Sequence, residues 1–155
     1  MKALIVFYSR TGTTKKVAQA LAQKLAADAE EIKDKVDRSG IIGYMKSGRD
    51  AMKGKLTELE PVAKDPAGYD LVIIGTPNWG RHISAGVRTY LTEQKEKIKK
   101  TAFFCTQGGS GDDKVFAEMK NVLGKDPAAL LTVSAKEAAK GEFEEKLDKF
   151  IAQLK

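Results

Sequence analysis

The chain has 155 residues, of which 42% are hydrophobic and 31% charged, and its formal net charge is +6 at pH 7. This length and balance predict a single domain over residues 1–155 and argue against disorder. No apolar run approaches the roughly 20 residues that span a bilayer. The short apolar run at the start lacks a signal-peptide cleavage pattern, so we expect no membrane span and a cytoplasmic location.

The chain has one cysteine, Cys105, and one histidine, His82. A single cysteine excludes an intrachain disulfide and is typical of a reducing compartment. Because other sulfur and imidazole ligands are missing, we expect no metal site. Lysines alternate with acids along the chain, without the aromatic residues that stack on RNA. The basic charge therefore favours a solvated surface or an acidic redox partner over nucleic acid.

The first half of the chain predicts two strands and two helices. Residues 3–8 form a short apolar run, typical of a strand buried on both faces of a parallel sheet. Apolar residues at helical spacing then predict a helix from about Thr14 to Ala27. Residues 30–33 are polar and fit a strand only at a sheet edge. A glycine-punctuated pattern from Ser39 to Lys53 is interpreted as a helix, although each interior glycine costs about 1 kcal/mol.

The second half continues this alternation. Three apolar runs predict further strands, at 71–75, 101–106 and 130–134. Helices are expected at 84–95, from an N-cap at Asp112, and over the last residues from Phe143 to Leu154. This alternation predicts an α/β fold with a doubly wound, five-stranded parallel sheet. With the polar strand at the edge, the expected strand order is 2-1-3-4-5.

The loop after the first strand has the composition of an anion site. It carries four hydroxyls, one arginine, one glycine and no acid: Ser9, Arg10, Thr11, Gly12, Thr13 and Thr14. A helix starts here, so several backbone amides lack an intrahelical partner. These amides lie at the positive end of the helix dipole. A helix cap needs only one hydroxyl, so the presence of four favours binding of an anion over capping alone. We expect phosphate to bind at this loop.

Two further loops leave the same edge of the predicted sheet. In an open parallel sheet, ligands bind beyond the carboxyl ends of the strands, where the strand order reverses. The second loop offers an aromatic ring between turn residues: Thr76, Pro77, Asn78, Trp79 and Gly80. The third is rich in glycine: Thr106, Gln107, Gly108, Gly109, Gly111 and Asp112. Together the three loops predict a site for a flat aromatic molecule that bears a phosphate.

With these loops the sequence resembles the flavodoxin family. Residues 9–14 match that family's hydroxyl-rich phosphate loop, and residues 75–80 look like the loop that flanks its flavin. The resemblance covers the whole chain and is to the short-chain branch. It implies FMN as the cofactor, with its phosphate on the first loop and its ring on Trp79. Backbone groups of 78–80 and 107–109 would bond the ring edges, and the Gly80 peptide would flip to accept from the reduced flavin.

Two departures from the family pattern matter. Flavodoxins are typically acidic, whereas this chain is basic. The family often stacks a second aromatic ring on the flavin from the third loop, which here has none. Either Trp79 stacks alone or a substrate occupies the other face, as in the related quinone reductases and the porphyrinogen-oxidising branch.

Two functions therefore remain open. One is an electron carrier that shuttles electrons through FMN between partner proteins and needs no catalytic side chain. The other is an FMN-dependent reductase or oxidase of a quinone or similar planar molecule. A receiver domain would need acids where Ser9 and Gly75 stand. The Rossmann and Walker glycine patterns are also missing.

Several residues have a simpler structural interpretation. Trp79 could fill the core, but its polar turn favours stacking. His82 is expected on the exposed surface, with proton donation to a substrate as the minor alternative. Cys105 lies within a strand and should be inert, and Asp112 should cap a helix rather than act as a base. Residues 40–52 are expected to form core and turns near the site rather than a substrate lid.

Overall fold

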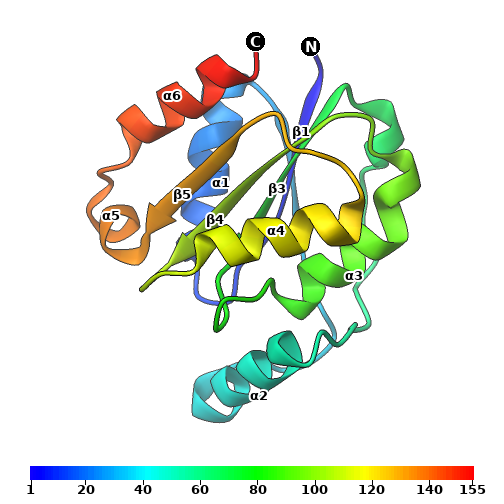
Figure 1. Ribbon diagram of the computed structural model, residues 1–155, viewed down its shortest axis with the longest axis vertical. Helices are drawn as coiled ribbons and strands as arrows, with labels where there is room; N and C mark the ends of the chain where they lie inside the picture. Colours follow the sequence, from blue (N-terminus) through cyan, green and yellow to red (C-terminus); the bar gives the residue numbers. More distant parts are fainter.

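The computed structural model describes residues 1–155 and contains a single five-stranded sheet. All neighbouring strands are parallel, in the order β2-β1-β3-β4-β5. The strands are β1 (Ala3–Tyr8), β2 (Asp28–Ile32), β3 (Leu71–Pro77), β4 (Thr101–Gln107) and β5 (Leu130–Ser134). Figure 1 shows this sheet in the middle of the molecule with helices on both sides. The expected doubly wound fold and strand order are confirmed.

Helices cover both faces of the sheet because alternate strand residues point into two separate cores. On one face, Ile5 and Phe7 of β1 pack with α1 (Thr13–Leu25), α5 (Ala135–Lys140) and α6 (Glu144–Gln153). On the other, Leu4 and Val6 pack with α3 (Ala85–Gln94) and α4 (Asp112–Leu123). Two single 3-10 turns lie at Pro66–Gly68 and Lys95–Lys97. The three middle strands are buried on both faces, as their apolar runs predict.

The edge strand and the first helix differ in their bounds from the prediction. Strand β2 begins at Asp28, two residues earlier than expected, and ends at Ile32, which pairs with Tyr8 at the end of β1. Helix α1 ends at Leu25 because Ala26 takes a left-handed conformation with φ 49°. The Ala26 amide bonds to carbonyls of the last turn, which closes the helix before the expected Ala27.

Two features near the carboxyl ends of β4 and β5 were predicted incorrectly or missed. Asp112 is not the N-cap of α4: Gly111 holds that position, with φ 109°, and Asp112 is the first helical residue. Helix α5 was not predicted. Its signal is a capping box in which Ser134 and Glu137 each bond the other's backbone amide.

Helix α2 (Gly40–Met52) lies outside both helical layers, at the bottom of Figure 1. Its bounds agree to within one residue with the helix expected over 39–53. It follows the end of β2 and is placed near the carboxyl ends of the central strands. No helix in the chain has the length and apolar character required to cross a membrane.

Candidate functional site

The three predicted loops meet at the carboxyl edge of the sheet around a cavity of about 260 Å³. Most of the predicted residues line it: Ser9, Arg10, Thr11, Thr13, Thr14, Pro77, Asn78, Trp79, Thr106, Gln107 and Gly108. Tyr44 of α2 and Ala135 of α5 complete the lining. The other predicted residues do not line this cavity: Gly12, Thr76, Gly80, Gly109, Gly111 and Asp112.

The first loop presents unpaired amides at the start of α1. The Ser9 hydroxyl accepts hydrogen bonds from the amides of Gly12 at 3.0 Å and Lys15 at 3.2 Å. Gly12 has φ 100°, which turns the chain into the helix. The amides of Thr11, Thr13 and Thr14 have no acceptor within the protein. These groups form a set of donors for an anion at the positive end of the helix.

Two threonines of this site have structural partners. The hydroxyls of Thr14 and Thr106 lie 2.8 Å apart and are buried, so they join the start of α1 to the end of β4. The Thr76 hydroxyl accepts from the Ser84 amide at 3.1 Å and donates to the Pro77 carbonyl at 2.8 Å. Thr76 therefore fixes the path from β3 to α3 without lining the cavity.

The second loop is a two-residue hairpin turn that presents Trp79. Trp79 and His82 exchange backbone hydrogen bonds of 2.9 and 3.1 Å. Gly80 and Arg81 between them have φ 60° and 72°, the two positive values of a type I′ turn. Glycine takes this geometry readily, whereas Arg81 holds it at a steric cost. The turn fixes the direction in which Trp79 leaves β3.

Asn78 ties the second loop to the third. Its side-chain carbonyl accepts from the Arg81 amide at 2.7 Å. Its amide nitrogen donates to Oε1 of Gln107 at 2.8 Å and to the Ser110 carbonyl at 3.2 Å. The two loops thus form one rigid wall of the cavity.

The Trp79 ring is held from behind by two side chains. Tyr8 meets it edge to face, with ring centroids 5.4 Å apart and an interplanar angle of 89°. The Arg38 guanidinium lies 5.6 Å from the centroid of the same ring, within cation–π range. Trp79 therefore packs partly against the core and still lines the cavity.

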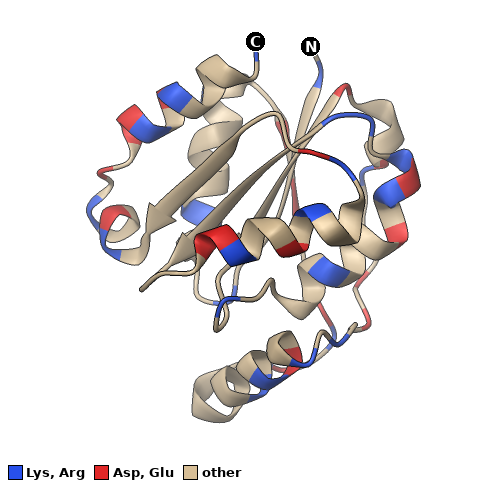
Figure 2. Cartoon of the chain, in the orientation of Figure 1, with Lys and Arg blue, Asp and Glu red and all other residues tan.

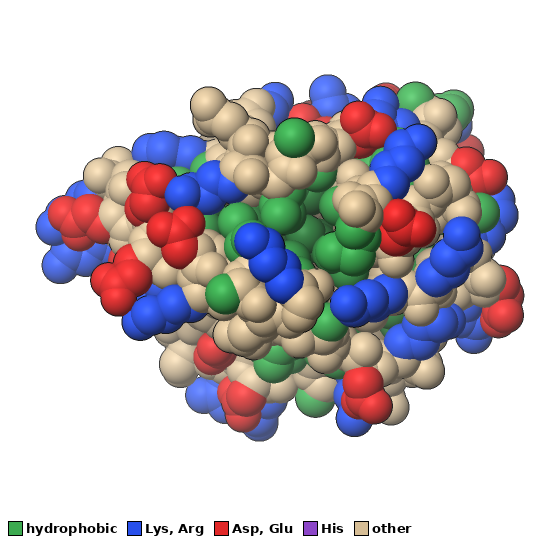
Figure 3. Space-filling model, turned by 90° about the horizontal axis from the view of Figure 1, so that it is seen from above, with side chains coloured by type: hydrophobic (Ala, Val, Ile, Leu, Met, Phe, Trp, Pro, Cys, Tyr) green, Lys and Arg blue, Asp and Glu red, His purple; other side chains and the backbone are tan.

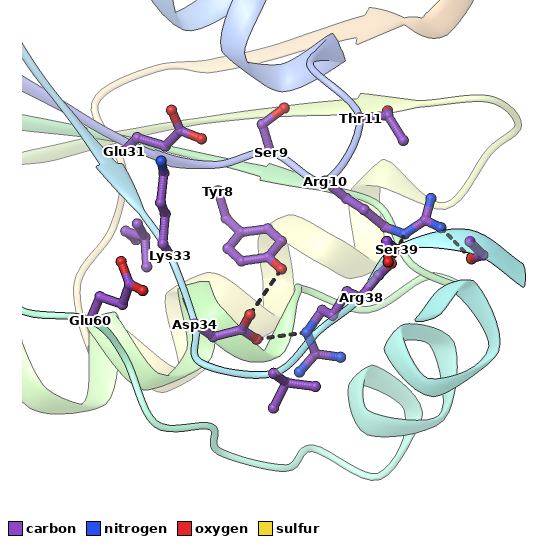
Figure 4. A pocket seen from close by; sticks show the side chains of 13 residues that line it. Tyr8, Ser9, Arg10, Thr11, Glu31, Lys33, Asp34, Arg38, Ser39 and Glu60 are labelled. Atoms are coloured by element: carbon purple, nitrogen blue, oxygen red, sulfur yellow. Dashed lines mark hydrogen bonds and ion pairs between the residues drawn. The ribbon is translucent and has the colours of Figure 1, made fainter. Parts of the chain in front are cut away.

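Arg38 belongs to a buried polar network that sequence reasoning missed (Figure 4). Its Nε donates to Asp34 at 2.6 Å, and its Nη1 donates to Asp50 at 3.2 Å and Ser47 at 3.4 Å. The Tyr8 hydroxyl donates to the other Asp34 oxygen at 3.3 Å. Burial, and then the neighbouring Asp34 charge, raise the pKa of Tyr8. The network connects the site to α2.

Arg10 links the first loop to α2. Its guanidinium donates to the carbonyls of Arg38 and Gly40, both at 2.8 Å, and lies 5.6 Å from the Tyr44 ring centroid. Tyr44 thus reaches the cavity opposite the loops, and sequence reasoning missed it. Its signal was its position as the only aromatic residue in the predicted helix that follows the edge strand. Tyr44 is a second aromatic side chain in the lining of the cavity, to which the third loop contributes none.

A second cavity, of about 490 Å³, lies between α2 and the Trp79 hairpin. It shares Tyr44, Asn78 and Trp79 with the first cavity, and Met45 and Met52 add apolar walls. Residues 40–52 lie near the site, as expected, but the prediction that they form core and turns is wrong, because they form a helix whose large apolar side chains are exposed.

His82 is not an ordinary exposed residue, contrary to the expectation. It lines the second cavity, and its Nδ1 lies 2.8 Å from Oε2 of Glu118 on α4. Glu118 also accepts from the Ile83 amide at 3.2 Å and pairs with Arg88. The carboxylate therefore orients the imidazole and leaves Nε2 without a partner in the protein.

The remaining candidates have structural surroundings. Asp112 accepts from the Thr132 hydroxyl at 2.8 Å, and this bond holds the pKa of its carboxyl below the usual value. Cys105 is buried in β4, as expected, and burial raises the pKa of its thiol to about 12, which disfavours the reactive thiolate. The structure contains no group of His, Cys, Asp and Glu side chains arranged to hold a metal ion.

The fold and this edge of the sheet define a class of doubly wound proteins that bind a phosphate-bearing ligand at the strand-order switch point. Within that class the family is clear. The family model described as flavodoxin matches residues 2–147, and the chain belongs to the flavodoxin family. In flavodoxins FMN lies at the switch point between β1 and β3.

Solved structures of other proteins share the fold. One is a flavoprotein from Lactobacillus acidophilus NCFM in complex with FMN: identity is 24% over 90% of this chain and 97% of that one, with a TM-score of 0.72. A second is a protein from Bacteroides uniformis ATCC 8492 that is proposed to be a flavoprotein. Its identity to this chain is 21%, the match covers 97% of both chains, and the TM-score is 0.80. A third is flavodoxin 2 from Bacillus cereus, with 18% identity over 99% of this chain and 98% of that one, and a TM-score of 0.60. Among curated protein sequences, none matches the chain.

Proposed function

We propose that this protein binds FMN without a covalent bond and transfers electrons through it. The observation that carries the proposal is that the unpaired amides of the first loop and the Trp79 ring border one cavity. The amides of Thr11, Thr13 and Thr14 would hold the phosphate, together with the loop hydroxyls. When bound, the flavin supplies one- and two-electron chemistry that no side chain of the protein can provide.

The flat ring of the cofactor would lie against Trp79. Tyr8 and Arg38 fix the plane of this indole from behind, so little ordering entropy is lost when a ring stacks on it. Tyr44 lines the same cavity from α2 and offers a second aromatic surface. The FMN complex of the Lactobacillus acidophilus flavoprotein, which shares the fold, supports FMN as the cofactor.

The test is a titration of the purified protein with FMN, followed by flavin fluorescence. We expect quenching that saturates at one FMN per chain, because Trp79 stacks on the ring. Trp79→Ala should weaken binding and shift the flavin midpoint potential. A protein that neither quenches FMN fluorescence nor purifies with a yellow flavin contradicts the proposal.

A second candidate is the reduction or oxidation of a small planar molecule, such as a quinone, by the bound flavin. Two observations favour it: the apolar cavity beside Trp79, and a His82 imidazole that Glu118 orients at its wall. A positioned imidazole can give or take the proton that such a reaction needs. Steady-state turnover with a nicotinamide donor and a quinone, compared with His82→Gln, separates this enzyme from a carrier that passes electrons to an acidic partner protein.

A further inference from the structure

Helix α2 leaves its large apolar side chains out of both cores, and two of them, Met45 and Met52, also border the open cavity beside Trp79. Its large apolar side chains are solvent-exposed: Ile41 by 80%, Ile42 by 79%, Met45 by 67% and Met52 by 69%. The residues it buries are small or polar: Gly43, Ser47, Asp50 and Ala51. At about 100° per residue, Ile41, Met45 and Met52 form one stripe opposite the buried side. An ordinary surface helix has the reverse arrangement.

This orientation is fixed by specific contacts. Asp50 and Ser47, on the buried side, bond to Arg38, whose side chain is only 3% exposed. Gly43 packs so closely on the Arg38 carbonyl that a Cβ atom there would overlap it. Rolling the helix to bury its isoleucines would break this network and leave charges unpaired in the interior. These contacts on the buried side therefore keep the apolar stripe exposed to solvent.

Basic side chains border the stripe. Lys46, Arg49, Lys53 and Lys55 lie on α2 or just after it, and Asp50, the one acid of this segment, points into the buried network. Figure 2 shows the segment with blue positions and a single red one. Figure 3 shows the opposite end of the molecule, where acidic and basic side chains alternate around apolar ones. Helix α2 differs because its own exposed charged side chains are all basic; the nearest exposed acid in the sequence, Asp37, is bonded to Ser39 ahead of the helix.

We propose that α2 docks the protein on an anionic lipid surface. The apolar stripe would enter the boundary between headgroups and acyl chains, and the bordering cations would contact lipid phosphates, as in interfacial amphipathic helices. A second copy of the chain would bring these cations against one another. A protein partner would need a groove to receive a protruding helix, whereas a bilayer accepts one without a matching shape. The proposal does not depend on FMN.

Co-sedimentation with vesicles tests the proposal, using the full chain with and without added FMN. Vesicles of phosphatidylglycerol and phosphatidylcholine in equal parts should pellet the protein, and vesicles of phosphatidylcholine alone should not. Raised salt should weaken binding without abolishing the apolar contribution. Lys53→Glu/Lys55→Glu should bind on the order of ten-fold more weakly. Lys99→Glu/Lys100→Glu, which makes the same charge change at exposed positions ahead of β4, should bind nearly as well as the wild type.

The apolar contribution is tested by Ile42→Asp/Met45→Asp. Both side chains are exposed, so the circular dichroism spectrum and melting temperature should be unchanged, and vesicle binding should be lost. Leu130→Asp, an exposed apolar residue on β5, is the matched control and should bind nearly as well as the wild type. Equal binding by Ile42→Asp/Met45→Asp would overturn the proposal in favour of plain charge attraction.

Two experimental results that assign this surface to another occupant would also overturn the proposal. One is a dimer in sedimentation velocity that Ile42→Asp/Met45→Asp dissociates, which would assign the stripe to a second copy. The other is binding to soluble polyglutamate with the same affinity as to anionic vesicles, which would assign the surface to an acidic protein.

Discussion

Two helices begin beside the candidate site, and different forces hold them. Helix α1 buries Val17, Ala18 and Leu21 in one of the two cores, as an amphipathic helix should. Helix α2 buries an ion network around Arg38 and exposes its apolar side chains. The first helix offers amides to the cavity and the second offers Tyr44. The site thus combines a rigid anchor in the core with a wall that hydrogen bonds and charges position.

Arg38 is the centre of the charge network that holds α2. Arg38→Met leaves the Asp34 and Asp50 carboxylates without their buried cation, and we expect a loss of about 3–5 kcal/mol in the free energy of unfolding. Urea denaturation measures it. Arg49→Met, at an exposed arginine of α2 itself, is the control. A loss below about 1 kcal/mol for Arg38→Met would mean that α2 is not held by this network.

The next largest effect contrasts apolar residues of the two helices. Leu21→Ala in α1 should cost about 2–5 kcal/mol, because it leaves a cavity in a closed core. Met45→Ala in α2 should change stability by no more than about 0.5 kcal/mol, because that side chain is solvent-exposed. Both are measured by urea denaturation. Similar losses for the two variants would show that α2 packs in solution as an ordinary amphipathic helix.

The smallest effect concerns alkaline pH. The pKa of Tyr8 is raised in the folded protein, so the unfolded chain loses this proton first as the pH rises through the ordinary value of about 10. The stability that Tyr8 contributes is complete below that pH and declines above it. Between pH 9 and pH 11, roughly one unit on each side of that value, wild-type stability should fall more steeply than that of Tyr8→Phe. Parallel curves from chemical denaturation would show that Tyr8 is not shielded by burial next to Asp34.

The sequence predicts the parts of this protein that follow a local pattern. The apolar runs of β1, β3 and β4 and the hydroxyl-rich loop at residues 9–14 are local patterns of neighbouring residues, so the strands and the position of this loop at the start of α1 could be predicted directly. Arg38 and Tyr44 could not. Their role depends on how a glycine-rich helix turns about its axis, which the buried contacts of Asp50 and Gly43 decide. The same contacts explain why the exposed stripe of α2 resembles a core stripe in sequence.

Errors in single residues have similar causes. Asp112 is of a residue type that often caps helices. Gly111 takes the N-cap position instead, because glycine adopts the left-handed backbone conformation at lower cost. The Asp112 carboxylate accepts a hydrogen bond from Thr132 on the neighbouring strand. His82 follows a turn and looked exposed in sequence. Glu118 is distant in the chain, and only the packing of α4 against α3 brings it to the imidazole.

We infer that residues 9–14 bind the phosphate of a flavin, and the sharpest test is the flavin affinity of the loop variant Thr11→Ala/Thr13→Ala. Both FMN and riboflavin, which has no phosphate, are titrated against wild type and variant, followed by flavin fluorescence. We expect FMN affinity to fall at least about 30-fold, because two hydroxyl contacts to a charged group are lost and each is worth roughly 1 kcal/mol or more. Riboflavin affinity should change little. Equal losses for the two flavins would contradict the phosphate assignment.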